Sequence, residues 1–160
     1  MNFDFSASNI NTESIGASYY LIGLINRFNN GFQAAADNIF EELSWKQIFF
    51  MNCVALFENA PTIKDMADLL GCSHQNAKQI LSKLEKQCFV EVFQDPVDKR
   101  KQRIVLTENA LEFRRRYDQL SEQAMQTLFG NISKEELLTT ISVFTRLNKN
   151  VDELKGQMEL

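Results

Sequence analysis

The chain has 160 residues and a formal net charge of −4, with 21 Asp and Glu against 17 Lys and Arg. This length favours one domain, or one domain with a helical extension, and 44% apolar residues are enough for a packed core. Only six Gly and two Pro argue against long linkers or a disordered chain. Three cysteines without paired spacing fit a reducing compartment better than a disulfide framework.

The N-terminal sequence MNFDFSASNI has no basic residue ahead of an apolar run, so it does not resemble a secretory signal. The longest apolar run near it, YYLIGLI (19–25), is far too short to span a bilayer. We therefore expect a cytoplasmic protein that does not act in a membrane.

The first predicted element is one long helix over about residues 13–43. Apolar side chains recur at helical spacing on both sides of Asn29-Asn30-Gly31, which we interpret as a weak point within a single helix. The sequence SWKQ (44–47) then has the pattern of a capping box, and it predicts a second helix over 45–57. Because this second segment is apolar on nearly every side, we expect neighbours to bury it all round.

Two short helices follow, separated by Gly-Cys-Ser. The sequence PTIKD (61–65) repeats the capping-box pattern and opens a helix that Gly71 ends. Ser73 caps the next helix, predicted over 74–87. Helical spacing gives this helix one buried face and one polar face. The buried face comprises Ala77, Ile80, Leu81 and Leu84, and the polar side comprises Gln75, Asn76, Lys78, Gln79, Ser82, Lys83 and Lys86.

A hairpin comes next. FVEVF (89–93) alternates like a strand, and RIVL (103–106) is a plausible returning strand. The turn between them concentrates positive charge in an acidic chain. Thr107 then caps a long helix to about Phe129, and Ser133 with Glu136 opens a last helix towards Leu154. This order predicts a mainly α (α+β) fold, a winged helix-turn-helix with flanking helices.

At this point the chain resembles the MarR (multiple antibiotic resistance regulator) family of bacterial transcription factors. The resemblance covers about 43–113 in motif and the flanking helices in layout. It is carried by LSWKQ, by TIKDMADLLGCSHQNAKQILSKLEKQCFVE and by the wing DPVDKRKQRIVLTENALEF. Cys88 and Ala110 stand where the family usually has Gly, and Val97 replaces a commonly basic wing residue. A Cys in a left-handed helix cap would be strained.

The resemblance implies a homodimeric regulator, which we expect to be a repressor of transcription, that binds a specific inverted repeat in duplex DNA. It divides the chain into an N-terminal dimerisation helix (1–43), a winged helix-turn-helix DNA-binding region (44–113) and C-terminal dimerisation helices (114–160). The terminal helices also carry more apolar surface than one small core requires, and their intertwining would set two recognition helices about 34 Å apart.

The predicted DNA contacts come from the recognition helix and the wing. Gln and Asn amides can pair with adenine in the major groove, so A·T pairs are expected at the centre of each half-site. Lysines can reach phosphates. The resemblance implies that Arg100 enters the minor groove, with Asp98 holding its guanidinium. The expected contacts are Ser73, His74, Gln75, Asn76, Lys78, Gln79, Lys83, Lys99, Arg100, Lys101 and Arg103.

Family members commonly release DNA when a small aromatic or lipophilic ligand binds. Aromatic candidates for such a pocket are Tyr19, Trp45, Phe49, Phe113 and Tyr117, although aromatic residues at helical spacing are more often plain core.

Two alternatives stay open. One is a thiol-based redox sensor of the same fold, with Cys88 as the candidate because it lies at a helix end. The other is a winged helix that binds protein instead of DNA. An enzyme is not expected, because there is a single His, no Gly-rich phosphate loop and no evident metal-ligand set. No metal or cofactor is expected.

Overall fold

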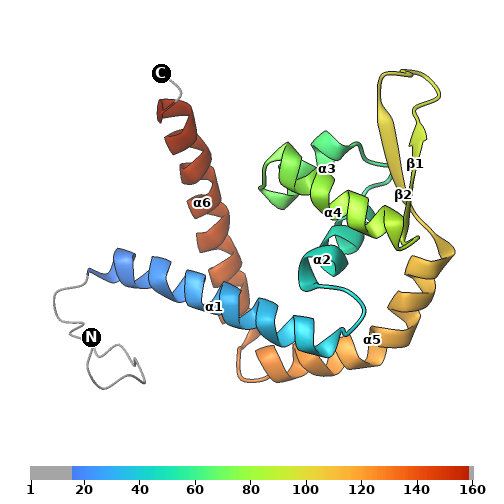
Figure 1. Cartoon of the computed structure of the whole chain (residues 1–160). Helices are drawn as coiled ribbons and strands as arrows, with labels where there is room; N and C mark the ends of the chain where they lie inside the picture. The colour runs from blue at the N-terminus through green and yellow to red at the C-terminus, as the bar shows by residue number, and fades with distance from the viewer. Residues whose placement is uncertain (1–15, 159–160) are drawn as a thin grey trace. The chain divides into compact units, whose positions relative to one another are not determined.

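The computed structural model describes residues 16–158. They form α1 (Ala17–Ile39), α2 (Trp45–Val54), α3 (Ile63–Leu70), α4 (His74–Lys86), β1 (Val90–Gln94), β2 (Gln102–Leu106), α5 (Glu108–Phe129) and α6 (Lys134–Met158). This order is the predicted one, and the winged helix-turn-helix fold class is confirmed (Figure 1). The chain divides into two compact units, 1–113 and 114–160, with the boundary inside α5.

Helix α1 is continuous, as predicted, through Asn29-Asn30-Gly31. One reason is local: the Gln33 amide nitrogen donates to the Asn29 side-chain oxygen over 2.9 Å, one helical turn away. The helix ends at Ile39, four residues before the predicted end, and the Phe40 N–H still bonds to Ala36. Residues 13–15 of the predicted helix lie outside the described residues.

The prediction for the second helix was partly wrong. Its capping box is present, since the Gln47 side-chain oxygen accepts from the Ser44 N–H over 3.1 Å. However, α2 ends at Val54 and not at 57, because the amides of Leu56 and Phe57 bond to carbonyls only three residues away. The helix is also not buried all round: Phe50 is fully buried, but Phe49 is 41% exposed.

The two helices of the helix-turn-helix begin as predicted. Thr62 and Asp65 form a reciprocal capping box at α3, with the Asp65 carboxylate accepting from the Thr62 N–H over 2.7 Å. Ser73 caps α4, since its Oγ accepts from the Asn76 N–H over 3.2 Å. These caps satisfy amides that have no partner within the helix, so they fix where each helix starts.

Both of these helices end in the same way. After α3, the Gly71 N–H bonds to Asp68 and the Cys72 N–H bonds to Ala67. After α4, the Cys88 N–H bonds to Glu85 and the Phe89 N–H bonds to Leu84. This pair of bonds is the Schellman motif, which needs one left-handed residue. Gly71 supplies it at φ 63°, and Cys88 supplies it at φ 58°, a conformation that strains a residue with a side chain.

The core of the first unit lies where α2, α3, α4 and the hairpin meet. Strands β1 and β2 pair antiparallel, with Val90 opposite Leu106 and Val92 opposite Ile104. The Ile104 N–H donates to the Pro61 carbonyl over 2.9 Å, so the segment before α3 is bonded to the outer side of β2. The largest fully buried side chains of the described residues are Phe50, Met51, Pro61, Met66, Leu84, Val90, Ile104 and Phe113.

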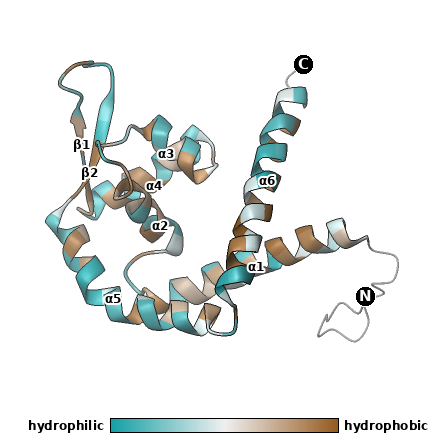
Figure 2. Ribbon diagram, turned by 180° about the vertical axis from the view of Figure 1, so that it is seen from behind, coloured by the Kyte–Doolittle hydropathy of each residue, from teal (hydrophilic) through white to brown (hydrophobic). Residues whose placement is uncertain are grey.

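The second unit consists of most of α5 together with the whole of α6. Ser133 and Glu136 form the predicted capping box at the start of α6, and the helix runs four residues past the predicted end. Apolar residues recur along α6, and along α1 in the first unit (Figure 2). Many of them are exposed, including Leu138, Ile141, Phe144, Val151 and Leu154 on α6. Among the described residues, no helix combines the length and hydropathy that crossing a bilayer requires.

The left-handed position gives a stability prediction. An L-residue there costs about 1–2 kcal/mol relative to Gly, which has no Cβ to clash. Because Cys88 is exposed, its side chain adds little packing. Cys88→Gly should therefore raise the free energy of unfolding by about 1 kcal/mol, measured by urea denaturation. Cys88→Ser is the matched control and should leave it nearly unchanged; a destabilised Gly variant would contradict the assignment.

Candidate nucleic-acid interface

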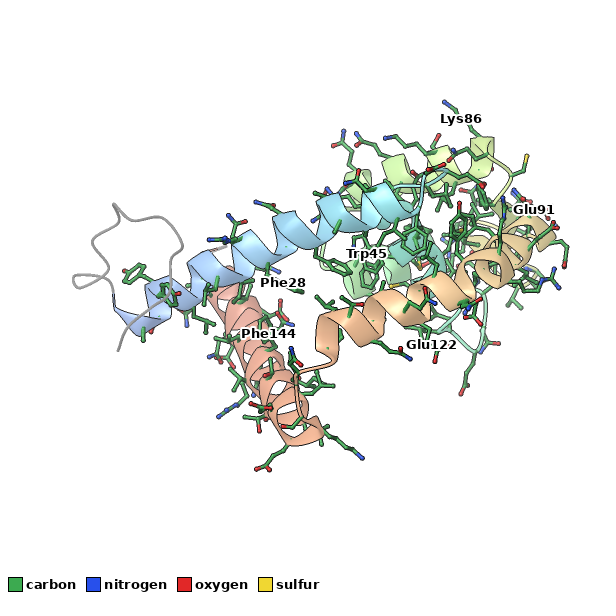
Figure 3. All side chains as sticks on the ribbon, turned by 90° about the horizontal axis from the view of Figure 1, so that it is seen from below. Phe28, Trp45, Lys86, Glu91, Glu122 and Phe144 are labelled. Atoms are coloured by element: carbon green, nitrogen blue, oxygen red, sulfur yellow. The ribbon has the colours of Figure 1, made fainter. Side chains whose placement is uncertain are left out.

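Helix α4 has one face packed on the core, on which Ile80 and Leu81 are half-buried, and one solvated face. Ala77 and Leu84 are both 0% exposed and point into the core, whereas the residues on the opposite side are exposed. Figure 3 shows one of them, Lys86, pointing away from the protein at the end of the helix. The exposed residues that the sequence predicted as DNA contacts on this helix or at its cap are Ser73, His74, Gln75, Asn76, Lys78, Gln79 and Lys83.

The wing is the turn over residues 95–101, and its cations point outward. The Arg100 side chain is 92% exposed. Its Nε donates to Asp98 Oδ1 over 3.2 Å, and Lys101 Nζ lies 3.6 Å from Asp98 Oδ2. Asp98 also accepts the Arg100 N–H, and these bonds lower the pKa of its carboxyl. The contact on which the expected orienting role of Asp98 depends is therefore present.

A groove lies between the wing and the helix-turn-helix. It is open and has a volume of about 390 Å³. Four cationic side chains from three elements line it: Lys64 at the start of α3, Lys78 on α4, and Arg100 and Lys101 on the wing. Thr62, Ile63, His74 and Gln102 complete the lining, which includes no acidic residue in the described part of the chain. Two of these cations, Arg100 and Lys101, share the Asp98 carboxylate, so the groove and its rim carry more positive than negative charge on one concave surface.

Arg103 does not resemble the other cations of the wing. Its Nε donates to Asp95 Oδ2 over 2.6 Å, and a terminal guanidinium nitrogen donates to the Ala60 carbonyl over 2.9 Å. Its side chain is only 28% exposed. The sequence grouped Arg103 with the DNA contacts because it follows three other cations, but its guanidinium is bonded within the protein.

The sequence did not predict Lys64 as a groove residue, and it indicated Asp95 only as part of the turn-forming pair Asp95-Pro96. Asp95 Oδ1 accepts from the N–H groups of Val97 and Asp98, and these bonds, together with Arg103, lower the pKa of its carboxyl to about 2. An Asp followed by Pro and two more residues is a known turn pattern that could have indicated this capping role. Lys64 had no local signal, since only the fold brings it to the wing.

The five aromatic candidates for a ligand pocket do not meet at one place. Trp45 stacks on Phe49 with ring centroids 5.7 Å apart and meets Phe32 of α1 edge-on at 4.6 Å. Figure 3 shows Trp45 lying against α1. Phe113 is instead buried in the core, edge-on to Phe89. Tyr19 is 81% exposed. Tyr117, half-buried, belongs to the second unit.

The cysteines differ in their surroundings. Cys53 is buried, and burial raises the pKa of its thiol, which disfavours the reactive thiolate. Cys72 is half-buried and Cys88 is exposed. Within residues 16–158 no three His, Cys, Asp or Glu side chains lie close enough together to hold a metal ion.

The fold and this surface define a winged helix-turn-helix protein with a cationic groove beside its second short helix. No family model matches the sequence, and no curated protein is significantly similar to it. Solved structures do match over most of the chain.

One match is a MarR/EmrR family transcriptional regulator from Acinetobacter sp. ADP1, with a TM-score of 0.76 at 18% identity over 87% of this chain and 99% of the other. A second is MepR of S. aureus in complex with DNA, with a TM-score of 0.72 at 20% identity over 86% and 99%. A third is FabT of Streptococcus pneumoniae in complex with DNA, with a TM-score of 0.63 at 17% identity over 87% and 99%. The chain therefore has the fold of the MarR-type regulators that its sequence resembles.

The lowered carboxyl pKa values predict acid sensitivity. The pKa values of Asp95 and Asp65 lie below the ordinary 3.8. Their ionised forms thus stabilise the folded state above about pH 4, and this contribution disappears as the pH falls towards the lowered values. We expect the melting temperature to fall between pH 4 and about 2. The Asp95→Asn variant should have a lower melting temperature than the wild type at pH 7, but its melting temperature should fall less on acidification.

Thermal melts followed by circular dichroism across this range provide the measurement. Repeating the titration at high salt separates this local effect from general repulsion among the cations, which salt screens. Wild-type and Asp95→Asn curves that run parallel down to pH 2 would contradict the assigned role of Asp95.

Proposed function

We propose that this chain is a transcription regulator that binds duplex DNA with sequence preference, and that its DNA-binding surface is α4 together with the wing. The observation that carries the proposal is the groove where Lys64, Lys78, Arg100 and Lys101 converge from three elements of an acidic chain. Charges of one sign that meet on a concave surface match the phosphate backbone of a duplex.

The exposed face of α4 supplies the chemistry for base recognition. Gln75, Asn76 and Gln79 lie in its first two turns and are exposed, and the N-terminal part of a recognition helix is the part that contacts base edges. Their amides can donate and accept at once, as pairing with adenine requires. Lys78 and Lys83 would bind phosphates, and A·T pairs are expected opposite the amides.

The wing would follow the duplex beside α4. Arg100, held by Asp98 at its base and exposed over most of its length, is the residue proposed to enter the minor groove, where narrow A-rich segments attract Arg. Lys99 and Lys101 would contact the flanking phosphates. The MepR and FabT structures, both described as complexes with DNA, support this assignment for the fold.

The salt dependence of binding tests this proposal. Arg100→Ala and Lys64→Ala should each reduce the slope of log K against log[salt] by about one unit and weaken binding about tenfold, since each removes one positive charge placed against the duplex, in the minor groove for Arg100 and at a phosphate for Lys64. Lys155→Ala, on α6 and outside the groove, is the matched control for the same loss of charge. Fluorescence anisotropy with a duplex selected from genomic fragments provides the measurement.

Two results would count against it. Slopes that stay unchanged in both groove variants would remove Arg100 and Lys64 from the interface. Negligible, salt-insensitive binding by the wild-type protein would favour the alternative, a winged helix that binds protein.

The exposed apolar residues support a homodimer. Tyr19, Ile22 and Phe28 on α1 are more than half exposed. Helix α6 also has exposed apolar side chains, including Leu138 and Ile141. A monomer rarely leaves so much apolar surface in water. We infer that the terminal helices pair across a two-fold axis, which would present two α4 helices to an inverted repeat. Repression would follow where that repeat overlaps a promoter.

Sedimentation equilibrium tests the dimer. The wild-type protein should have a mass of twice 18.4 kDa. The double variant Ile141→Glu with Phe144→Glu should sediment as a monomer, because charge in an apolar interface costs several kcal/mol. Ser142→Glu, an exposed polar position between them on a different side of α6, is the control and should remain dimeric. A monomeric wild-type protein would contradict the proposal.

Phe32, Trp45 and Phe49 form an aromatic group between α1 and α2. We propose this group as the binding contact for a small aromatic ligand that relieves DNA binding. The dispersed positions of Tyr19 and Phe113 give them no part in this proposal.

A further inference from the structure

The base of the wing is held by three residues that we call the wing-base network: Ala60, Asp95 and Arg103. The Arg103 guanidinium bridges the Asp95 carboxylate, at 2.6 Å, and the Ala60 carbonyl, at 2.9 Å. Ala60 precedes α3, Asp95 begins the hairpin turn, and Arg103 lies in β2 opposite Phe93. The network therefore connects the wing to the helix-turn-helix that carries α4.

Asp95 also bonds to the backbone of the turn. It is 6% exposed, and its second oxygen accepts the N–H groups of Val97 and Asp98 over 2.8 and 2.9 Å. Its own N–H donates to the Lys101 carbonyl over 2.9 Å. Asp98 in turn binds Arg100. A continuous series of bonds thus runs from the α2–α3 loop to the cation at the tip.

Such a connection is needed because a two-stranded hairpin is only marginally stable by itself. Each strand has five residues, and Phe93 and Gln94, beside the turn, are exposed. A tip that moved freely would lose conformational entropy on binding, and the affinity would fall by that amount. A buried, charge-assisted network orders the tip before any ligand arrives.

We propose that Arg103 and Asp95 are positioning residues: they fix the wing against the helix-turn-helix so that Arg100 reaches the duplex, and they do not contact DNA themselves. This inference rests on the proposed DNA-binding function. Burial distinguishes the two cations, since Arg103 is 28% exposed and already has two partners, whereas Arg100 is 92% exposed.

The sign of the effect at Asp95 separates positioning from charge. Removing a negative charge from a DNA-binding surface strengthens attraction to phosphates if electrostatics alone decides. Removing the anchor of the turn weakens binding if position decides. Asp95→Asn keeps the shape of the side chain but loses the ion pair with Arg103, so the two accounts predict opposite changes.

The first experiment measures binding to a fluorescent random-sequence duplex of about 30 base pairs, roughly three helical turns. Arg103→Gln and Asp95→Asn should each weaken binding about tenfold. Adding Arg100→Ala to Arg103→Gln should then weaken binding by less than a further twofold, although Arg100→Ala alone weakens binding by the wild-type protein about tenfold. Lys155→Ala is the control for loss of one charge. Tighter binding by Asp95→Asn, or additive effects of Arg100 and Arg103, would overturn the inference.

The second experiment needs no DNA. Amide hydrogen exchange of Val97 and Asp98, whose N–H groups bond to Asp95, should be at least tenfold faster in Arg103→Gln, while the amides of α4 keep their wild-type rates. Arg103→Lys retains the charge but cannot bond to Asp95 and Ala60 with a planar guanidinium. Its exchange rates should lie between those of the wild type and of Arg103→Gln. Wild-type exchange rates in Arg103→Gln would overturn the inference, and faster exchange throughout the unit would identify a folding role instead.

The two experiments also separate the inference from the proposed function. A wild-type protein that fails to bind any duplex refutes DNA binding, and amide exchange still decides whether Arg103 orders the wing. A protein that binds DNA but exchanges Val97 and Asp98 at wild-type rates in Arg103→Gln refutes only the positioning role.

Discussion

The narrow apolar face of α4 is the constraint on which the candidate interface depends. Ala77 and Leu84 are fully buried, and a helix with 3.6 residues per turn that buries these positions must expose the positions opposite them. Burial therefore orients the amides of Gln75 and Gln79 outward without any contact of their own. The Ser73 cap and the left-handed residue Cys88 fix the two ends of the helix, so its length and its rotation are both determined.

The wing is held by a different kind of interaction. It has little apolar surface to bury, and its position comes from hydrogen bonds that Asp95 and Arg103 make at its base. A buried carboxylate without partners would be costly, but Asp95 accepts two amides and a guanidinium, so its charge is satisfied. One part of the interface thus depends on packing and the other on electrostatics, which gives them different responses to acid and to salt.

Much of the fold could be predicted because its signals are local. The capping boxes at Thr62 and Ser133 and the stop at Gly71 involve residues within three or four positions of each other, and each is present. The end of α2 could not be predicted in the same way, since apolar residues continue past Val54 and only the backbone turn ends the helix. The exposure of Phe49 was also missed, because a stretch of apolar residues does not indicate which neighbours are present.

The sequence by itself determined the order of the elements, the polar face of α4 and the cationic wing, because periodicity, caps and turn residues act between near neighbours in the chain. Only the tertiary structure decided which cations share a groove and which are bonded internally. Lys64 reaches the wing, and Arg103 reaches the Ala60 carbonyl 43 positions away. Lys64, Arg100 and Arg103 carry the same charge, but the folded chain gives each a different set of partners.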